Sequence, residues 1–182
     1  TTEIYTLSLH DALPILMNAG AYGGEMKDIL QKVTVLTPDG TVQTLSVEEL
    51  ELSYRHSIIP EKGYLVISAV LKLQPGNADE IQSIMDDLKE KRVSKQPLEY
   101  PSAGSTFKRP EGYFAGKLIQ DAGLRGFRVG GAQVSEKHCG FIINRDQATS
   151  TDICQLMQQV SEIVYEKFGV RLEPEVKKIG EF

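Results

Sequence analysis

The fold assignment depends on one stretch near the middle of the chain, Ser102-Ala103-Gly104-Ser105-Thr106-Phe107-Lys108-Arg109-Pro110. The hydroxyl of Ser105 lies between small residues on one side and the Lys108–Arg109 pair on the other. A hydroxyl beside two positive charges suits a nucleophile or a proton donor that acts on an anion. An isolated Gly-Ser pair is more typical of an ordinary loop. The interpretation therefore depends on the sequence around this stretch.

On the N-terminal side, the pattern predicts strands before a helix. Residues 31–36 and 41–45 are rich in β-formers and flank a Pro38-Asp39-Gly40 turn signal, which predicts a hairpin. Residues 64–73 predict a long strand that ends before Pro75. A helix is expected from about Asp79, with an apolar face and a basic C-terminal end. That face contains Ile81, Ile84, Met85 and Leu88. Residues 93–113, which hold several Pro and Gly, are expected to be a connection without regular structure.

On the C-terminal side, a short helix is expected over 115–122 and is ended near Gly123. A bent strand or turn follows over 127–134, and then a short strand over 140–143. A long helix begins after a Thr149 or Ser150 cap and ends at Gly169. Its apolar stripe consists of Ile153, Leu156, Met157, Val160, Ile163, Val164 and Phe168. With a final strand expected over 170–179, the fold class is α+β.

Composition excludes several classes of protein. The chain has 182 residues, 41% of them hydrophobic and 25% charged, as in a soluble globular protein of one or two domains. Its formal net charge of −5 argues against a nucleic-acid partner. No apolar run is long enough for a membrane span. The two cysteines, Cys139 and Cys154, form neither a disulfide framework nor a metal motif, so a reducing cytoplasmic location is expected.

Three further residues could carry chemistry. Arg55 can clamp a carboxylate through two parallel hydrogen bonds, although an isolated Arg usually forms a surface ion pair. Glu175 follows Pro174, and a single Glu is usually a solvated surface residue, as we expect for Glu173. His138 stands beside Cys139, and two such residues do not make a metal site. We therefore interpret His138 as structural and predict no metal site.

Three motifs in order give the chain a resemblance to a known family. The first is Asn18-Ala19-Gly20-Ala21-Tyr22-Gly23-Gly24-Glu25, the second is the Ser102–Pro110 stretch, and the third is Leu172-Glu173-Pro174-Glu175-Val176. From about Met17 to the C-terminus, the sequence resembles UDP-N-acetylenolpyruvoylglucosamine reductase. This family consists of NADPH-dependent FAD enzymes that make UDP-N-acetylmuramate for peptidoglycan in bacterial cell walls. The resemblance implies FAD as cofactor, NADPH as reductant and a sugar-nucleotide substrate.

The resemblance also implies roles for individual residues. Ser105 would donate a proton to a substrate carbon, Arg55 would hold the enolpyruvyl carboxylate, and Glu175 would help to stabilise the enol-like intermediate. The residues expected near FAD are Asn18, Gly20, Tyr22, Gly23, Arg92 and Lys177. The residues expected near the substrate are Tyr54, Lys95, Lys108 and Arg109. His56, which follows Arg55, is expected to be solvated.

The resemblance divides the chain into four parts. Residues 17–101 resemble the remainder of an FAD-binding domain of the vanillyl-alcohol-oxidase type, and 102–172 resemble the family's C-terminal α+β substrate domain. Residues 173–182 would be a strand that returns to the flavin domain. Residues 1–16 do not resemble the family. We expect residues 1–15 to be an artefactual and poorly packed stretch that stands where the parent chain has its N-terminal flavin-binding domain.

Two other functions fit parts of the sequence. A non-catalytic sugar-nucleotide-binding module would use Lys95 and Lys108 but would need neither Ser105 nor Glu175. Another FAD oxidoreductase with the same type of flavin domain would not be expected to carry the Ser102–Pro110 stretch. Because Arg55, Ser105 and Glu175 occur together and in register, the reductase interpretation is favoured over both.

Overall fold

The computed structural model describes residues 2–6 and 14–180. The chain divides into two compact units, which we call unit 1 (Thr1–Ala78) and unit 2 (Asp79–Phe182). Each unit has its own antiparallel sheet and its own apolar core. The α+β class predicted from the sequence is therefore confirmed. The division into four functional parts stays a prediction.

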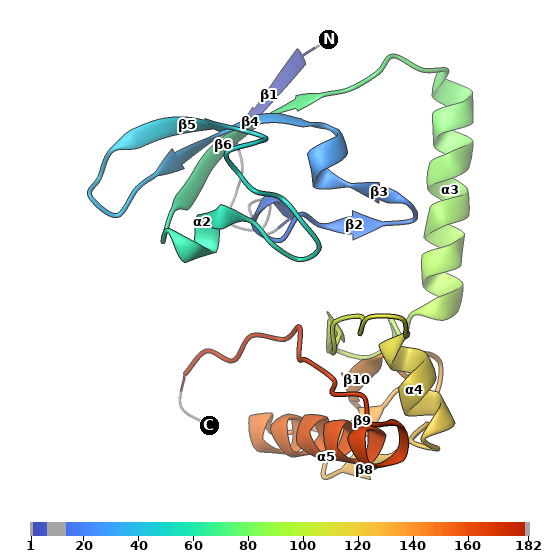
Figure 1. Cartoon of the computed structure of the whole chain (residues 1–182). Coiled ribbons are helices and arrows are strands. Elements are labelled where there is room, and N and C mark those ends of the chain that lie inside the picture. The colour runs from blue at the N-terminus through green and yellow to red at the C-terminus, as the bar shows by residue number, and fades with distance from the viewer. Residues whose placement is uncertain (1, 7–13, 181–182) are drawn as a thin grey trace. The chain divides into compact units, whose positions relative to one another are not determined.

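Unit 1 is built on a four-stranded sheet with the order β1-β6-β4-β5 (Figure 1). β4 (Leu30–Leu36) and β5 (Val42–Ser46) pair as the predicted hairpin. β6 (Leu65–Lys72) is the predicted long strand and lies between β4 and β1 (Thr2–Thr6). Along β4, Val33 and Val35 are fully buried while Lys32 is exposed and Thr34 is half-buried, so one face of this part of the strand enters the core. The short helix α2 (Ile58–Glu61) adds Ile59 to the same core.

Residues 2–6 and 14–16 are more structured than the sequence indicated. β1 pairs with β6 from Thr2 opposite Lys72 to Thr6 opposite Ser68. Ile15 is 1% exposed and belongs to the core of unit 1. The expectation of a poorly packed stretch is therefore wrong for these described residues. The edge of β6 offers free backbone groups with which an extended segment can pair, whatever its side chains.

The helix α3 (Ala78–Lys95) starts where predicted and ends within the segment expected to be a connection. None of its residues is buried. Ile84 and Met85 are 59% and 57% exposed, so the predicted apolar face has helical spacing but does not lie in a core. Spacing alone does not bury a face, because an apolar stripe is buried only where another element covers it. Within the described part of the chain, neither core cluster includes a residue of α3.

Unit 2 is built on a sheet with the order β7-β10-β9-β8 and two packed helices (Figure 1). Its strands are β7 (Ser102–Ser105), β8 (Arg128–Val129), β9 (Ala132–Val134) and β10 (Phe141–Asn144). β8 and β9 confirm the predicted turn at Gly130-Gly131, and β10 confirms the predicted short strand. The helix α4 (Ala115–Asp121) also lies where predicted, and Gly123 with φ +82 follows its end.

The helix α5 (Ser150–Phe168) is the element that the sequence defined best. The Thr149 hydroxyl accepts a hydrogen bond from the Asp152 N–H, and the Asp152 carboxylate accepts one from the Thr149 N–H. This reciprocal pair is a capping box, and Gly169 with φ +69 ends the helix. Leu156, Met157, Val160 and Val164 are buried in the core of unit 2. Phe168, at the end of the stripe, is 40% exposed.

Two predictions near the C-terminal domain are also wrong. β7 lies inside the segment 93–113, which was expected to lack regular structure, and it exists because β10 pairs with it. The expected strand over 170–179 is reduced to one bridge between Phe107 and Pro174. Its residues favour extended backbone, but a strand also needs a partner edge, which Thr106–Lys108 supplies over only a few residues. Within residues 14–180, no helix is both long and apolar enough to cross a membrane.

Candidate active site

In unit 2, the C-terminal tail lies against the stretch that follows β7. The Lys108 N–H donates to the Glu173 carbonyl at 2.8 Å, and the Glu175 N–H donates to the Thr106 carbonyl at 2.9 Å. These bonds flank the Phe107–Pro174 bridge. They place Glu175 opposite Thr106, next to Ser105, although about 70 positions separate the two segments in sequence. Two of the three family-like motifs therefore meet within unit 2.

The neighbouring hydroxyls of Ser105 and Thr106 have different environments. The Thr106 side chain is 3% exposed and accepts the Ile142 N–H at 3.0 Å, which fixes the end of β7 against β10. The Thr106 N–H also donates to the Gly140 carbonyl at 2.8 Å. Ser105 is exposed, and it pairs with Phe141 through its backbone. The anchored Thr106, which sequence reasoning did not single out, thus holds an accessible Ser105 hydroxyl at the end of the strand.

The two basic residues of the Ser102–Pro110 stretch are held by neighbouring groups. The Lys108 ammonium forms an ion pair and hydrogen bond with the Glu173 carboxylate. Glu173 is an exposed surface residue, as expected, and its carboxylate also pairs with Lys108. The Arg109 guanidinium lies 3.9 Å from the centre of the Phe114 ring, and its Nε donates to the Tyr113 carbonyl at 3.3 Å. Both cations are therefore held by neighbouring groups of unit 2, Lys108 by a carboxylate and Arg109 by a ring and a carbonyl.

In unit 1, Tyr54 and Arg55 form the tip of a tight turn. The backbones of Ser53 and His56 exchange two hydrogen bonds of 3.2 Å, which closes a two-residue loop. Arg55 has φ +57 at the third position of the turn, where glycine is usual. Its guanidinium carbon lies 5.2 Å from the centre of the Tyr54 ring. A non-glycine residue in this conformation costs about 1–2 kcal/mol, so the turn presents Arg55 at an energetic cost.

His56 is not simply solvated, as the sequence had suggested. Its Nε2 lies 2.7 Å from the Glu61 carboxylate and its Nδ1 lies 2.9 Å from the Glu51 carbonyl. The Glu61 hydrogen bond, and then the Glu51 carbonyl, raise the pKa of His56 above its ordinary value. The protonated form is therefore stabilised in the folded state.

We expect Glu61→Gln to lower the pKa of His56, because it removes the main group that favours the charged ring. A raised pKa gives stability that is fully present below the ordinary pKa, near 6.5, and is lost as the pH rises through the folded value. A proton NMR titration of the His56 ring measures the shift. Glu51→Gln should lower the pKa of His56 less, because Glu51 contacts the ring through its backbone carbonyl and its side-chain charge is the weakest influence on the ring. An unchanged His56 midpoint in Glu61→Gln would contradict the assignment.

The first family-like motif forms a hairpin, β2 (Gly20–Ala21) and β3 (Gly24–Glu25). Tyr22 and Gly23 have φ +53 and +89, the pattern of a type I′ turn. Tyr22 is 57% exposed at the tip, and a Cβ on Gly23 would meet no atom within 4 Å. A Cβ on Gly20 would lie 2.8 Å from Glu25 Cγ, so Gly20 admits the Glu25 side chain. The hairpin therefore exposes backbone and a ring at its tip.

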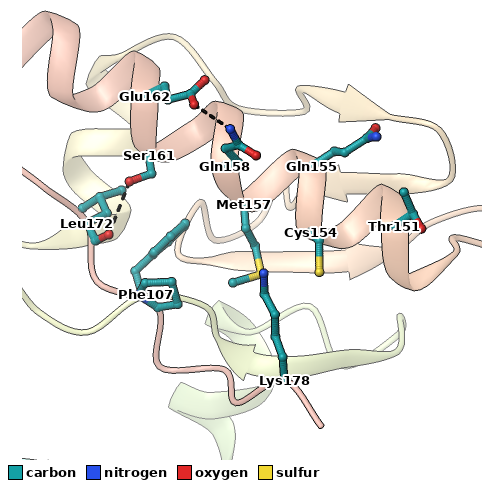
Figure 2. A pocket seen from close by; sticks show the side chains of 11 residues that line it. Phe107, Thr151, Cys154, Gln155, Met157, Gln158, Ser161, Glu162, Leu172 and Lys178 are labelled. Atoms are coloured by element: carbon teal, nitrogen blue, oxygen red, sulfur yellow. Dashed lines mark hydrogen bonds between the residues drawn. The ribbon is translucent and has the colours of Figure 1, made fainter. Parts of the chain in front are cut away.

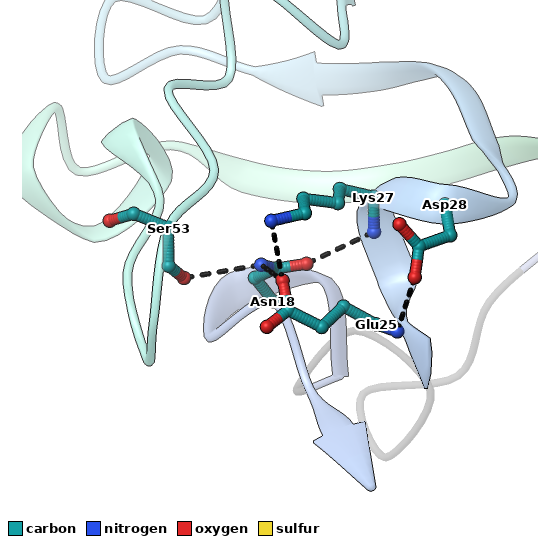
Figure 3. A network of polar contacts seen from close by, with 5 residues as sticks. All are labelled: Asn18, Glu25, Lys27, Asp28 and Ser53. Atoms are coloured by element: carbon teal, nitrogen blue, oxygen red, sulfur yellow. Dashed lines mark hydrogen bonds and ion pairs between the residues drawn. The ribbon is translucent and has the colours of Figure 1, made fainter. Parts of the chain in front are cut away.

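Behind the hairpin, Asn18 is the centre of a buried polar network (Figure 3). Its Nδ2 donates to Glu25 Oε2 at 2.9 Å and to the Ser53 carbonyl at 3.2 Å, and its Oδ1 accepts the Lys27 N–H at 3.0 Å. Lys27 Nζ lies 2.8 Å from the same Glu25 oxygen. The Lys27 hydrogen bond and then the Asn18 hydrogen bond lower the pKa of the Glu25 carboxyl. The Asn18 amide thus contacts protein groups on every side.

The other predicted residues lie at the edges of unit 2. Arg92 and Lys95 are exposed in the last turn of α3, and Lys177 is exposed in the tail. His138 is half-buried, accepts the Gly140 N–H at 3.0 Å and meets the Phe141 ring edge-on. Burial lowers the pKa of His138. The structural interpretation of His138 stays a prediction, with which these contacts agree.

Two cavities flank the tail. One, of about 550 Å³, lies between α5 and the tail, where Lys178 extends towards Met157 (Figure 2). The other, of about 300 Å³, lies beside β7 and is lined by Ser102, Ala103, Thr106 and Val176 among other residues. The second cavity is lined by neighbours of Ser105 and Glu175, namely Thr106 and Val176, and not by these two residues themselves.

Comparison with known proteins gives one consistent result. Residues 96–179 match the model of the family "UDP-N-acetylenolpyruvoylglucosamine reductase, C-terminal domain". The reductase of that name from Agathobacter rectalis is 66% identical over 168 residues, which are 92% of this chain and 54% of that protein. The corresponding protein from Clostridioides difficile is 58% identical over 167 residues, 92% of this chain and 55% of the relative.

The fold is similar to that of a solved member of the same group. The crystal structure of UDP-N-acetylenolpyruvylglucosamine reductase from Thermus caldophilus superposes with a TM-score of 0.77 at 37% identity, over 90% of this chain and 59% of that one. The class defined by fold and site is therefore an α+β protein related to sugar-nucleotide reductases. The chain is similar to UDP-N-acetylenolpyruvoylglucosamine reductases over 92% of its length, and residues 96–179 match the C-terminal domain of that family. It spans about half the length of the curated relatives it matches.

Proposed function

We propose that this chain is part of an enzyme that uses NADPH and FAD to reduce UDP-N-acetylglucosamine enolpyruvate to UDP-N-acetylmuramate, for peptidoglycan synthesis. The observation that supports the proposal is the pairing of Thr106–Lys108 with Glu173–Glu175, which joins the Glu175 backbone to Thr106, the residue after Ser105. The identities with reductases of this name support it.

The overall reaction adds one hydride and one proton across the enolpyruvyl double bond. Hydride goes to the methylene carbon, the adjacent carbon takes the proton, and NADPH becomes NADP⁺. When bound, FAD would carry the electrons between NADPH and the substrate. Ser105 would donate its hydroxyl proton to the adjacent carbon, which gives the lactyl ether. The nearby Lys108 and Arg109 cations would favour the serine oxyanion left behind.

Two further residues would act on charge that develops in the reaction. The Arg55 guanidinium would hold the substrate carboxylate through two parallel hydrogen bonds. Glu175, which is half-buried, would help to stabilise the enol-like intermediate. Tyr54, stacked on Arg55, would line the same part of the pocket. Lys95, Lys108 and Arg109 would face the phosphates or carboxylate of the substrate.

The hairpin tip fits a flat cofactor in part. Tyr22 is exposed, and the backbone at Gly23 is open to contact because no atom lies within 4 Å of a Cβ built there. Arg92 and Lys177, both exposed cations, would lie near the flavin. Gly20 faces Glu25 instead, so its contribution would be to the shape of the hairpin. Cys139 and Cys154 are free thiols, which favours a reducing, cytoplasmic location.

The test uses a hybrid reductase, in which the region of the A. rectalis protein that matches this chain is replaced by this chain's sequence. We expect the hybrid to bind FAD, NADPH to bleach the flavin under anaerobic conditions, and the enolpyruvyl substrate to restore its colour. Restoration only by oxygen would favour another FAD oxidoreductase. Binding of the sugar nucleotide without flavin would favour the non-catalytic module.

A further inference from the structure

The turn that carries Arg55 is attached to a distant segment at both ends. On one side, the Ser53 carbonyl accepts two hydrogen bonds, one from the His56 N–H that closes the turn and one from Asn18 Nδ2. On the other side, the Ser57 hydroxyl donates to the Leu16 carbonyl at 2.7 Å. These contacts join positions 35 and 41 residues apart in sequence. The turn therefore depends on the segment around Asn18 for its position.

The attachment is buried and fully bonded. Asn18 and Ser57 are 1% and 2% exposed. Both Asn18 amide hydrogens and its carbonyl oxygen have partners, and Glu25, one of those partners, is itself bound by Lys27 (Figure 3). Hydrogen bonds in such closed networks rigidify the groups they join, because an unpaired buried polar group is costly. Asn18 is thus suited to fix the position of the turn that carries Arg55.

Arg55 needs such a fixed geometry. With φ +57, its backbone is in a region that non-glycine residues avoid. A turn without support would relax towards negative φ, which would redirect the Arg55 side chain. Strained residues persist only where surrounding structure holds them, and the Asn18 and Ser57 contacts are two long-range side-chain bonds that hold the ends of this turn.

We propose that Asn18 is a positioning residue that holds the Ser53–His56 turn so that Arg55 faces the substrate carboxylate. This inference rests on the proposed function of Arg55. It differs from the direct FAD contact that the sequence resemblance suggested for Asn18. The two roles are separable, because a positioning residue acts through Arg55 and a flavin contact acts on the cofactor.

The main variant is Asn18→Gly, which removes the amide but suits the positive φ of +43 at this position. In the hybrid reductase, we expect kcat/KM for the enolpyruvyl substrate to fall by about 10- to 100-fold, the loss typical of a misplaced catalytic group. Flavin content and the rate of flavin reduction by NADPH should stay unchanged. Gln147→Gly is the matched control, because Gln147 also has positive φ (+48) but lies in unit 2.

A double-mutant cycle distinguishes this inference from the function on which it rests. Asn18→Gly should add little to Arg55→Ala, because Asn18 acts through Arg55. Additive losses, or loss of flavin from Asn18→Gly, would overturn the positioning role while leaving the reductase function intact. An Arg55→Ala variant with unchanged kcat/KM for the enolpyruvyl substrate would instead refute the role of Arg55.

A structural measurement tests the positioning role of Asn18 without any assay of activity. In this chain, amide exchange at His56 should speed up at least tenfold in Asn18→Gly and stay unchanged in Gln147→Gly, since only the first variant frees the Ser53 carbonyl. Unchanged exchange in both variants would overturn the proposal. If Asn18→Gly does not fold, Asn18→Asp, which has the same shape but no donors, takes its place.

Discussion

Replacing Ser105 by alanine is expected to slow reoxidation of the reduced hybrid reductase by the enolpyruvyl substrate about 100- to 10,000-fold, the usual contribution of a positioned general acid. Reduction of the flavin by NADPH should proceed at the original rate. The two half-reactions differ because only the second requires a proton on carbon. Stopped-flow absorbance of the flavin follows each half-reaction separately.

The fold should tolerate this change. Ser105 is exposed and pairs with β10 through its backbone, so the hydroxyl is not required for the strand. Ser102→Ala is the matched control, because Ser102 is also exposed and lies at the other end of β7. We expect Ser102→Ala to leave both half-reactions within about twofold of the parent rates, since isolated surface substitutions have small effects.

Other outcomes have clear meanings. A Ser105→Ala protein that is slow in both half-reactions, or that melts at a much lower temperature, would make Ser105 a structural residue. Equal losses in Ser102→Ala and Ser105→Ala would assign the effect to β7 as a whole. Partial recovery by Ser105→Cys, which restores a proton donor of similar size, would support the proton-donor role.

Local signals in the sequence were sufficient for several elements. The Pro38-Asp39-Gly40 turn and its flanking β-formers fixed the β4–β5 hairpin. The Thr149 cap, the apolar stripe and Gly169 fixed α5. In these segments, the physical cause lies within a few neighbouring residues, so periodicity and turn chemistry predict the result.

The wrong predictions concern contacts between distant segments. β7 is a strand because β10 pairs with it, and Ser102–Ser105 alone have no strand pattern. The tail has the residues of a strand but only the short edge at Thr106–Lys108 to pair with. The sequence likewise predicted the apolar face of α3 but did not predict that this face is exposed. Pairing and covering are tertiary properties, which single-sequence patterns do not encode.

The candidate site shows the same limit. Motif resemblance selected Ser105 and Glu175, and the hydrogen bond from Glu175 to Thr106, the residue after Ser105, agrees with a shared site. The motif resemblance did not show that Lys108 is joined to Glu173 or that Thr106 anchors β7. Nor did it show that the Asn18 amide is directed into the protein. Each of these depends on a partner between seven and 65 positions away.

Gly131→Ala is expected to destabilise unit 2 severely. A Cβ at this position would lie 2.1 Å from the Asp146 carbonyl oxygen and 2.5 Å from the Ala148 nitrogen, both of them backbone atoms that cannot rotate away. The Gly131 carbonyl also accepts the Arg145 and Asp146 N–H groups, and its own N–H donates to Asp152 at 3.4 Å. The residue therefore joins the β8–β9 turn to the segment that begins α5.

We expect a loss of about 3 kcal/mol or more in the free energy of unfolding, at the upper end for overpacked sites because backbone must move. Urea unfolding followed through amide NMR signals of α5 measures it. Gly112→Ala is the control, because its φ of +74 is strained for alanine but a Cβ there meets no atom within 4 Å. That variant should lose only about 1 kcal/mol, the cost of the backbone conformation alone. Equal losses in the two variants would show that φ, and not the close approach of Asp146 and Ala148, determines the effect, and that the contact between the β8–β9 turn and α5 is looser than these distances imply.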